Sequence, residues 1–440
     1  DSPAVAFEDW LRIAEFEPTD VWPKAWARLY CERSMDLIYD FLVGQGVTFL
    51  PVVNWPERGL LTPGNSLPRW HITWGTGSEI IKKVLAALER HPHRDRLRVL
   101  CDHEVARLEV EQGRAVGVAG RDLRDGVDFR ARAESTLIAA GGICGGDLST
   151  VKKHWNPNWG EPPASLLNGS HRYADGLLHE QVRRAGGMLT HLENQWHYAA
   201  GIHHPARRKF QDGLSLLPPR SALWLNARGK RIGPMPLVGY TDTRHLVEAI
   251  LAEPGQYSWL VMNWKIAIRE LAASGGEFMT AFRDKKKFQV LKNFLLGDKS
   301  LVRRLIKECP EDVVVAHSLP ELAEGMNKRN LGAESVSLPD LKKAIEEYDA
   351  QIELGSQYFS DDQLRRILTF RQFRGDRLRI CKFQKILAPS ALPLIAIRSF
   401  ILSRKSLGGI LTDLESRVLS SAGQPIPGLY AIGEAAGFGG

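Results

Sequence analysis

The segment IPGLYAIGEAAG, residues 426–437, carries the clearest structural signal in this chain of 440 residues. Its apolar run over 429–432 predicts a strand that ends at Gly433 and Glu434. A glycine at the end of a parallel strand lets a ligand approach the backbone without meeting a Cβ atom. The glutamate that follows can accept hydrogen bonds from a ribitol or ribose hydroxyl. The segment therefore predicts one wall of a nucleotide site.

A second predicted strand with a similar end lies far upstream. Residues 135–140 form an unbroken run without a charge, which is typical of a buried strand, and the run stops at the pair Gly141–Gly142. Before it, a short strand at 97–100 and two strands at 105–110 and 115–118 predict a small antiparallel meander. A helix, a meander and a strand that ends in a double glycine are typical of the second half of a two-part nucleotide-binding domain.

Helices are predicted on either side of these strands. Apolar residues recur every three to four positions over 10–42, which indicates a helical region that ends before a strand at 47–53. Ser78 is a good N-cap for an amphipathic helix whose apolar face runs over 80–88. A further helix is predicted over 177–185.

The chain changes character between residues 196 and 385. Tryptophans, prolines and charged helices mix there without a regular pattern, which indicates a separate cap domain. A strand-rich segment at 393–402 and a hairpin at 408–418 then lead back to the closing strand. We therefore interpret the chain as an α/β protein with an α+β cap: a discontinuous, Rossmann-like domain of residues 1–195 and 386–440, interrupted by the cap of 196–385.

Composition narrows the function classes. The 58 basic and 51 acidic residues give a net charge of +7. The clusters Arg207–Lys209 and Lys285–Lys287 have no interleaved aromatics, so we read both as solvated faces rather than as a nucleic-acid site, while an anionic substrate or an acidic membrane surface stays open. No apolar stretch reaches the roughly 18 residues of a membrane span. Five cysteines without a CxxC pair favour a reducing, cytoplasmic setting and no structural metal site.

Four motifs in order resemble one superfamily. Leu137–Gly142, Asp175–Gly176, Gly408–Gly409 and Gly433–Glu434 together resemble the fumarate reductase and succinate dehydrogenase flavoproteins. The run GNSLPRWHITWGTG at 64–77 is similar to a bacterial group within it, the FAD-binding dehydrogenases. The resemblance implies an FAD-binding domain, an inserted cap, and an active site between the two over the flavin.

Both ends of the family fold are expected outside this sequence. The family begins with a strand, a GxGxxG turn and a helix that holds the FAD diphosphate, and it continues past the final glycines into a helix beneath the flavin. Neither part is recognisable between Asp1 and Gly440, so we expect the sequence to be an internal portion of the fold.

The resemblance also implies which residues bind the cofactor. The predicted FAD-binding residues are Val105, Ala140, Gly141, Gly142, Asp175, Gly408, Gly409, Gly433 and Glu434.

Three residues are candidates for substrate charge and proton handling. His197 falls at the place of a substrate-binding histidine in fumarate reductases, and the alternative is a structural histidine in a cap loop. Arg244, in a Thr-Arg step before a helical run, corresponds to their catalytic arginine, and the alternative is a surface arginine. Lys405 stands where they have a histidine and could stabilise a reduced flavin, and the alternative is a lysine that holds a hairpin turn.

The expected function is hydride transfer between a CH–CH or CH–OH group of a small organic substrate and flavin N5. A ketosteroid-type dehydrogenase is an alternative, although its catalytic tyrosine step reads Leu394–Ala396 here. A non-catalytic binding protein on a flavoprotein scaffold is a second alternative. The sequence names neither the substrate nor the electron acceptor.

Overall fold

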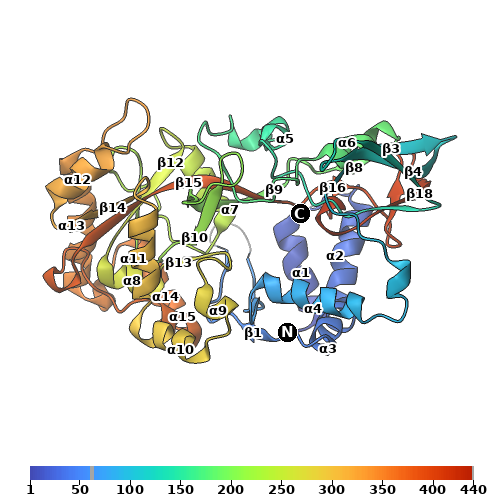
Figure 1. Cartoon of the computed structure of the whole chain (residues 1–440). Helices are drawn as coiled ribbons and strands as arrows, with labels where there is room; N and C mark the ends of the chain where they lie inside the picture. Colours follow the sequence, from blue (N-terminus) through green and yellow to red (C-terminus); the bar gives the residue numbers. More distant parts are fainter. Residues whose placement is uncertain (60–63, 439–440) are drawn as a thin grey trace.

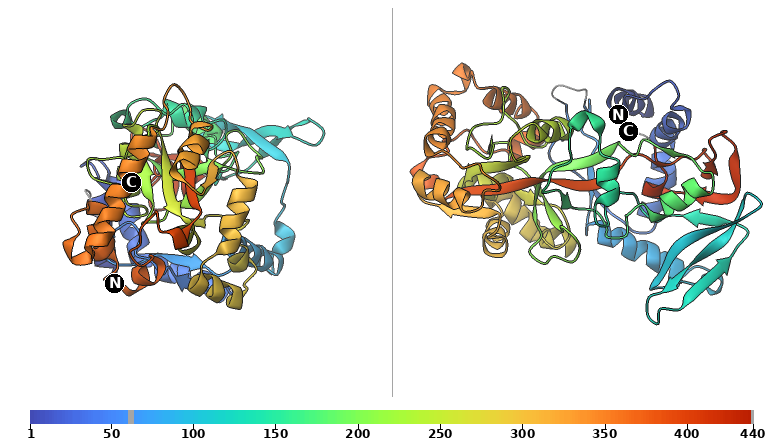
Figure 2. Two further views of the ribbon diagram at one scale, coloured as in Figure 1. Left: turned by 90° about the vertical axis from the view of Figure 1, so that its left-hand side faces the viewer. Right: turned by 90° about the horizontal axis from the view of Figure 1, so that it is seen from above.

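The computed structural model describes residues 1–59 and 64–438, which form an elongated molecule. A helical lobe lies at one end, a strand-rich lobe at the other, and the N-terminal helices lie between them (Figure 1). Two long strands, β9 (Gln195–His203) and β15 (Leu394–Ser406), run from one lobe into the other (Figure 2). The expected α/β class is confirmed by this arrangement.

Strand β15 is the centre of an eight-stranded sheet in the order β11-β12-β15-β9-β10-β13, with β14 and β7 also paired to β15. Its first half pairs with β12 (Tyr257–Asn263) and β14 (Val313–Ala316), and its second half pairs with β9 and β7 (Leu167–Asn168). The first ten residues of β15 are all buried, and most of them are apolar, as a strand covered on both faces requires. The remaining strands of the sheet are β10 (Gly213–Leu217), β11 (Leu223–Leu225) and β13 (Ala272–Ala273).

The nucleotide-type lobe contains the two strands that the glycine motifs predicted. β18 (Pro425–Ala431) runs parallel to β6 (Thr136–Ile138), so that Ala431 lies opposite Ile138. Parallel strands end at the same edge of a sheet, and the two glycine motifs therefore meet there. A third strand, β17 (Arg417–Leu419), pairs with β18.

The predicted three-stranded antiparallel meander is present, but only two of its predicted strands are confirmed, and its third strand lies after them. It consists of β3 (His103–Glu111), β4 (Arg114–Asp122) and β5 (Asp128–Arg132). The predicted strand at 97–100 is wrong: these residues are irregular and Val99 is 64% exposed. No described strand lies beside them to satisfy their backbone groups, and apolar residues alone do not make a strand.

The helical region predicted before the strand at 47–53 is confirmed, but it is not one continuous helix. It divides into α1 (Pro3–Ala14), α2 (Val21–Ser34), a π-helical turn at Met35–Tyr39 and α3 (Asp40–Gly44). The helix then leads into β1 (Phe49–Pro51), which pairs with β2 (His71–Thr73). Helix α4 (Gly77–Glu89) follows, but Ser78 is not its N-cap, because the helix already begins at Gly77 and the Ser78 hydroxyl donates to the Gly75 carbonyl at 3.1 Å.

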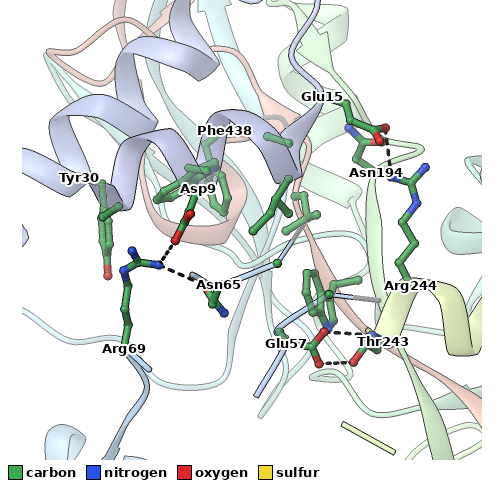
Figure 3. Close-up of a pocket in the computed structure, with 18 of the residues that line it drawn as sticks. Asp9, Glu15, Tyr30, Glu57, Asn65, Arg69, Asn194, Thr243, Arg244 and Phe438 are labelled. Carbon is green, nitrogen blue, oxygen red and sulfur yellow. Dashed lines mark hydrogen bonds and ion pairs between the residues drawn. The ribbon is translucent and has the colours of Figure 1, made fainter. Parts of the chain in front are cut away.

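Asp9 ties the 64–77 run to helix α1 (Figure 3). Its buried carboxylate accepts hydrogen bonds from Ser66 N (2.9 Å) and Ser66 Oγ (2.7 Å) and pairs with the guanidinium of Arg69. Burial would raise the pKa of Asp9, but the Ser66 hydrogen bonds and Arg69 outweigh it and lower this pKa to about 2. The carboxylate therefore stays charged and keeps the run in place.

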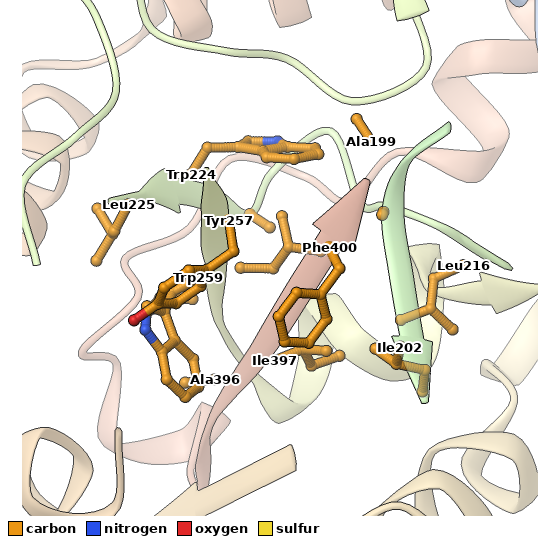
Figure 4. Packing of buried hydrophobic residues seen from close by; sticks show 14 of the residues in the cluster. Ala199, Ile202, Leu216, Trp224, Leu225, Tyr257, Trp259, Ala396, Ile397 and Phe400 are labelled. Atoms are coloured by element: carbon orange, nitrogen blue, oxygen red, sulfur yellow. The ribbon is translucent and has the colours of Figure 1, made fainter. Parts of the chain in front are cut away.

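The main core lies on both faces of the eight-stranded sheet. Trp224, Tyr257, Trp259 and Phe400 are at most 1% exposed, and the rings of Tyr257 and Phe400 are 5.9 Å apart (Figure 4). Burying side chains of this size contributes roughly 1.5–3 kcal/mol each. Helices that pack around this core are α7 (Thr243–Leu251), α8 (Trp264–Glu270), α11 (Lys299–Glu308), α12 (Leu319–Asn327) and α13 (Leu338–Leu354).

The other helices and the closing hairpin complete the fold. The predicted helix at 177–185 is confirmed as α6 (Leu177–Arg184). The predicted hairpin is present as a Thr412–Val418 bridge, but β16 (Gly409–Ile410) pairs with β8 (Leu189–Thr190) instead. The remaining helices are α5 (Ser149–Lys153), α9 (Thr280–Arg283), α10 (Lys287–Leu296), α14 (Asp362–Phe370) and α15 (Arg374–Arg379). Along the described residues no helix is both long enough and apolar enough to cross a bilayer.

Candidate active site

A cavity of about 1350 Å³ lies where the N-terminal helices, the 64–71 segment and helix α7 face one another (Figure 3). Residues 156–159 and 191–197 form a further wall. Large rings dominate its lining: Trp10, Tyr30, Trp70, Trp159, Trp196 and Phe438. A space of this size and character suits a flat organic molecule together with part of a cofactor.

Glu57 holds the start of helix α7 at the edge of the cavity. Its carboxylate accepts hydrogen bonds from the backbone N (3.0 Å) and the hydroxyl of Thr243. Burial raises the pKa of Glu57 above its ordinary value. A buried carboxyl with a raised pKa in a cavity wall is a candidate for proton transfer. Glu57 was not among the site residues predicted from the sequence. Its only distinguishing feature there is that it is an acidic residue in a loop rich in Pro, Gly and Asn.

Arg244 also lines the cavity, as its place at the start of α7 requires. Its guanidinium pairs with Glu15 (3.1 Å) and Glu248 (3.1 Å), and Glu248 also accepts a hydrogen bond from Trp159 Nε1 (3.1 Å). Burial would lower the pKa of Arg244, but the two carboxylates raise it above its ordinary value. Arg244 therefore remains a cation whose charge is largely offset by its neighbours.

His197 is the second predicted residue on this cavity. It lies on β9, is 2% exposed, and stacks on Trp155 with ring centroids 4.9 Å apart. Burial lowers the pKa of His197 to about 3, so the ring is neutral at physiological pH. Neither ring nitrogen has a hydrogen-bond partner within residues 1–59 and 64–438. A buried polar ring without a hydrogen-bond partner is uncommon in proteins, which makes His197 a candidate for a functional role.

Lys405 lies elsewhere. It is exposed on β15 and lines a separate hollow of about 440 Å³ together with Arg404, Ala139–Gly141 and Glu434. The structure thus brings His197 and Arg244 to one cavity and places Lys405 with predicted cofactor residues instead.

Three predicted cofactor residues at the ends of β6 and β18, Ala140, Gly141 and Glu434, line this hollow, and Gly433 directly precedes Glu434. Glu434 Oε1 accepts a hydrogen bond from Ser406 N at 2.9 Å, and its other oxygen has no partner in the described part of the chain. Gly433 and Gly141 have φ of 66° and 81°, which glycine adopts without strain. A Cβ atom on Gly433 would meet no atom within 4 Å. Open backbone and a free carboxylate oxygen fit a nucleotide cofactor.

Three other predicted glycines serve packing. A Cβ on Gly142 would lie 2.3 Å from Ser406 Oγ, one on Gly408 1.9 Å from the His191 carbonyl oxygen, and one on Gly409 2.6 Å from the Ala435 carbonyl oxygen. These close approaches hold the Glu434 turn against the end of β15. Gly142, Gly408 and Gly409 therefore allow the backbone segments around the hollow to pack closely, and they do not themselves provide space for a ligand.

The last two predicted cofactor residues lie outside both cavities. The Asp175 carboxylate accepts a hydrogen bond from Leu177 N at 2.9 Å and so starts helix α6. Val105 lies on β3 opposite Gly120, in the meander. Neither is among the residues that line the cavity or the hollow.

Comparison with known proteins places this geometry in context. The family model described as an FAD binding domain matches residues 1–440. A KsdD-like steroid dehydrogenase of Mycobacterium tuberculosis is 35% identical over 465 residues, covering 100% of this chain and 80% of that protein. Its counterpart in Mycolicibacterium smegmatis is 36% identical over 458 residues, covering 100% of this chain and 82% of that protein.

Solved structures share the fold at low identity. A 3-ketosteroid delta1-dehydrogenase from Sterolibacterium denitrificans superposes with a TM-score of 0.64 at 14% identity, over 99% of this chain and 84% of that one. A flavocytochrome c3 fumarate reductase gives a TM-score of 0.63 at 16% identity, over 100% of this chain and 64% of that one.

Proposed function

The chain belongs to the FAD binding domain family, and on that premise we propose that it is an FAD-dependent dehydrogenase of the ketosteroid type. The reaction would remove two hydrogens from neighbouring carbons of a neutral, ring-shaped ketone. Full-length relatives named as steroid dehydrogenases support this choice of substrate class. The expected division into a cofactor lobe (1–195 and 386–440) and a cap (196–385) is retained as part of the proposal.

The observation that carries the proposal is the chemistry of the cavity wall. Aromatic rings form part of its lining and His197 is neutral. The charges of its two arginines are offset, Arg69 by Asp1 and Asp9 and Arg244 by Glu15 and Glu248. A carboxylate substrate would need an uncompensated cation, because burying a charge without a partner is costly. The cavity therefore favours a neutral, apolar substrate over the anionic one that the sequence left open.

Three side chains would act on such a substrate. When bound, FAD supplies the acceptor for the hydride that leaves one carbon. A ring N–H of His197 can donate a hydrogen bond to the ketone oxygen, which makes the C–H bond next to the carbonyl more acidic. Glu57, whose carboxylate lies in the cavity wall beside Thr243, can take the proton from that carbon. Arg244 would fix the wall through Glu15 and Glu248.

The cofactor would be held at the second hollow. Glu434 would accept a hydrogen bond from a sugar or ribityl hydroxyl, and Gly141 and Gly433 would admit it close to the backbone. Lys405 would place a positive charge beside it, which favours the gain of electrons by the cofactor.

The test is reduction of the flavin by substrate. The protein is purified with FAD and mixed without oxygen with 4-androstene-3,17-dione, the steroid bound in a related 3-ketosteroid dehydrogenase structure. Bleaching of the flavin absorbance bands is expected. The matched control is dithionite-reduced protein mixed with fumarate, which should stay reduced. Reoxidation by fumarate without bleaching by the steroid would replace the proposal with a fumarate reductase, and a colourless protein would favour a binding role.

A further inference from the structure

Helix α10 presents its apolar face to solvent. Phe288, Leu291 and Leu295 recur at positions i, i+3 and i+7 and are 91%, 55% and 60% exposed, and Leu296 is 65% exposed. In a surface helix of a globular protein this stripe normally faces the core. Within α10 only Val290, Asn293 and Phe294 are partly buried against the protein. Arg269 holds the end of the helix by donating hydrogen bonds to the carbonyls of Phe294 (2.7 Å) and Leu295 (2.9 Å).

The exposed patch extends onto helix α15. Arg269 also donates to the Leu378 carbonyl at 2.6 Å, so the end of α15 lies beside the end of α10 (Figure 1). Leu378 is itself 42% exposed. Phe288, Leu291, Leu295, Leu296 and Leu378 together form what we call the α10 patch. Contiguous exposed apolar residues of this kind usually mark an interaction surface.

Basic residues surround the α10 patch. Lys287, Lys292, Arg374 and Arg377 are exposed, and none has an ion-pair partner among the residues that the structure describes. An apolar stripe of Phe and Leu flanked by Lys and Arg is typical of a helix that lies in the plane of a membrane surface. Uncompensated positive charge is complementary to anionic lipid headgroups.

The same charges disfavour a second copy of the chain. A two-fold symmetric contact through the patch would bring the unpaired basic residues of both copies, among them Lys287 and Lys292, into one interface. An anionic lipid surface takes up both the apolar side chains and the charges.

We propose that the α10 patch docks the protein onto membranes that contain anionic lipids. Contacts connect the helix before α10 to one wall of the main cavity: Phe282 on α9 packs against Trp74 with ring centroids 5.1 Å apart, and Trp74 follows β2, whose His71 lines the cavity. Docking through the α10 patch does not depend on the identity of the substrate.

The experiment measures vesicle binding by flotation. The FAD-loaded protein is expected to float with vesicles of phosphatidylcholine mixed with phosphatidylglycerol, and to stay behind with pure phosphatidylcholine. The variant Lys287→Glu with Lys292→Glu should bind at least about fivefold more weakly for each lysine changed. Phe288→Ser with Leu295→Ser should lose most of the remaining binding.

Matched controls separate the patch from general charge and exposure. Lys152→Glu with Lys153→Glu changes two exposed lysines on α5, on the opposite side of the molecule in Figure 1, and should bind like the wild type. Tyr358→Ser removes another exposed ring, which is 65% exposed, and should leave vesicle binding unchanged. Flavin absorbance and thermal unfolding show that each variant is folded.

Three outcomes overturn the inference. The first is equal binding to neutral and anionic vesicles, and the second is unchanged binding by both α10 variants. The third is a wild-type dimer in light scattering that Phe288→Ser dissociates, which would make the patch a contact between copies.

Discussion

Replacing Asp376 with asparagine should destabilise the protein by about 3–5 kcal/mol. The carboxylate is fully buried and lies 2.7 Å from Arg220 Nη1 and 3.0 Å from Arg58 Nη2. It also accepts a hydrogen bond from Trp55 N at 3.3 Å. Asparagine keeps the shape but removes the negative charge, so two guanidinium groups, 3% and 15% exposed, lose their counter-ion. Arg58 retains its stack over Trp55 at 4.1 Å, which places the expected loss toward the lower end of this range.

Urea unfolding followed by tryptophan fluorescence measures this loss. The control is Asp36→Asn, which removes one partner of a half-exposed pair with Arg33 and should leave the unfolding free energy unchanged. If Asp376→Asn were as stable as this control, the charge would not be required by its buried arginines, and the reasoning would fail. Trp55, whose backbone N–H donates to Asp376, lies two residues before Glu57 of the cavity wall. The variant should therefore also reduce the flavin with steroid more slowly.

Three further predictions concern the site. Glu434→Ala should weaken FAD binding about tenfold or more, because a hydrogen bond to a charged group contributes about 1.5–3 kcal/mol. A fluorescence titration of the apoprotein with FAD measures this affinity. If the variant bound FAD as tightly as the wild type, Glu434 would not belong to the cofactor site. Arg244→Met should slow steroid-dependent flavin bleaching about two- to fivefold at unchanged FAD absorbance, because it removes the cation between Glu15 and Glu248 in the cavity wall. Stopped-flow mixing would measure the rates, and equal rates would assign Arg244 to the surface. His197 has a folded pKa of about 3 against an ordinary 6.5, so the unfolded state binds the extra proton between these values and stability falls as the pH drops through them. His197→Phe should therefore recover about 2 kcal/mol of the stability lost near pH 5, measured by unfolding at about pH 5 and pH 7.5, and an unchanged acid loss would contradict the neutral ring.

The sequence predicted the parts of the fold that depend on local patterns. The strands before Gly141 and Gly433 were recognisable because an apolar run and a glycine lie within a few residues of each other. The structure adds that these two strands pair with each other in parallel, which the local patterns did not predict. The strand at 97–100 was wrong because a strand also needs a neighbour, which a local pattern does not report.

The candidate site depends on contacts between distant residues, which a single sequence does not reveal. Glu57 meets Thr243 across 186 residues, and Asp376 meets Arg58 across 318. Lys405 was assigned with His197 and Arg244 by its place in a motif. An irregular register between Ser403 and Lys405 sets the direction of its side chain, and no pattern in the sequence predicts that irregularity.

Strand β15 has a consequence for anyone who wishes to exchange caps between enzymes of this kind. It is one uninterrupted run of 13 residues, with its first half in the sheet of the helical lobe and its second half leading to the Glu434 turn. A transplant that cut the chain at the cap boundary predicted from the sequence, residue 386, would remove β12 and β14 with the cap and leave β15 without these partners. A force that pulls on either lobe is transmitted to the other through the backbone of β15. The two lobes should therefore unfold together, and a chimaera should succeed only if β15 and its partners β12 and β14 come from the same protein.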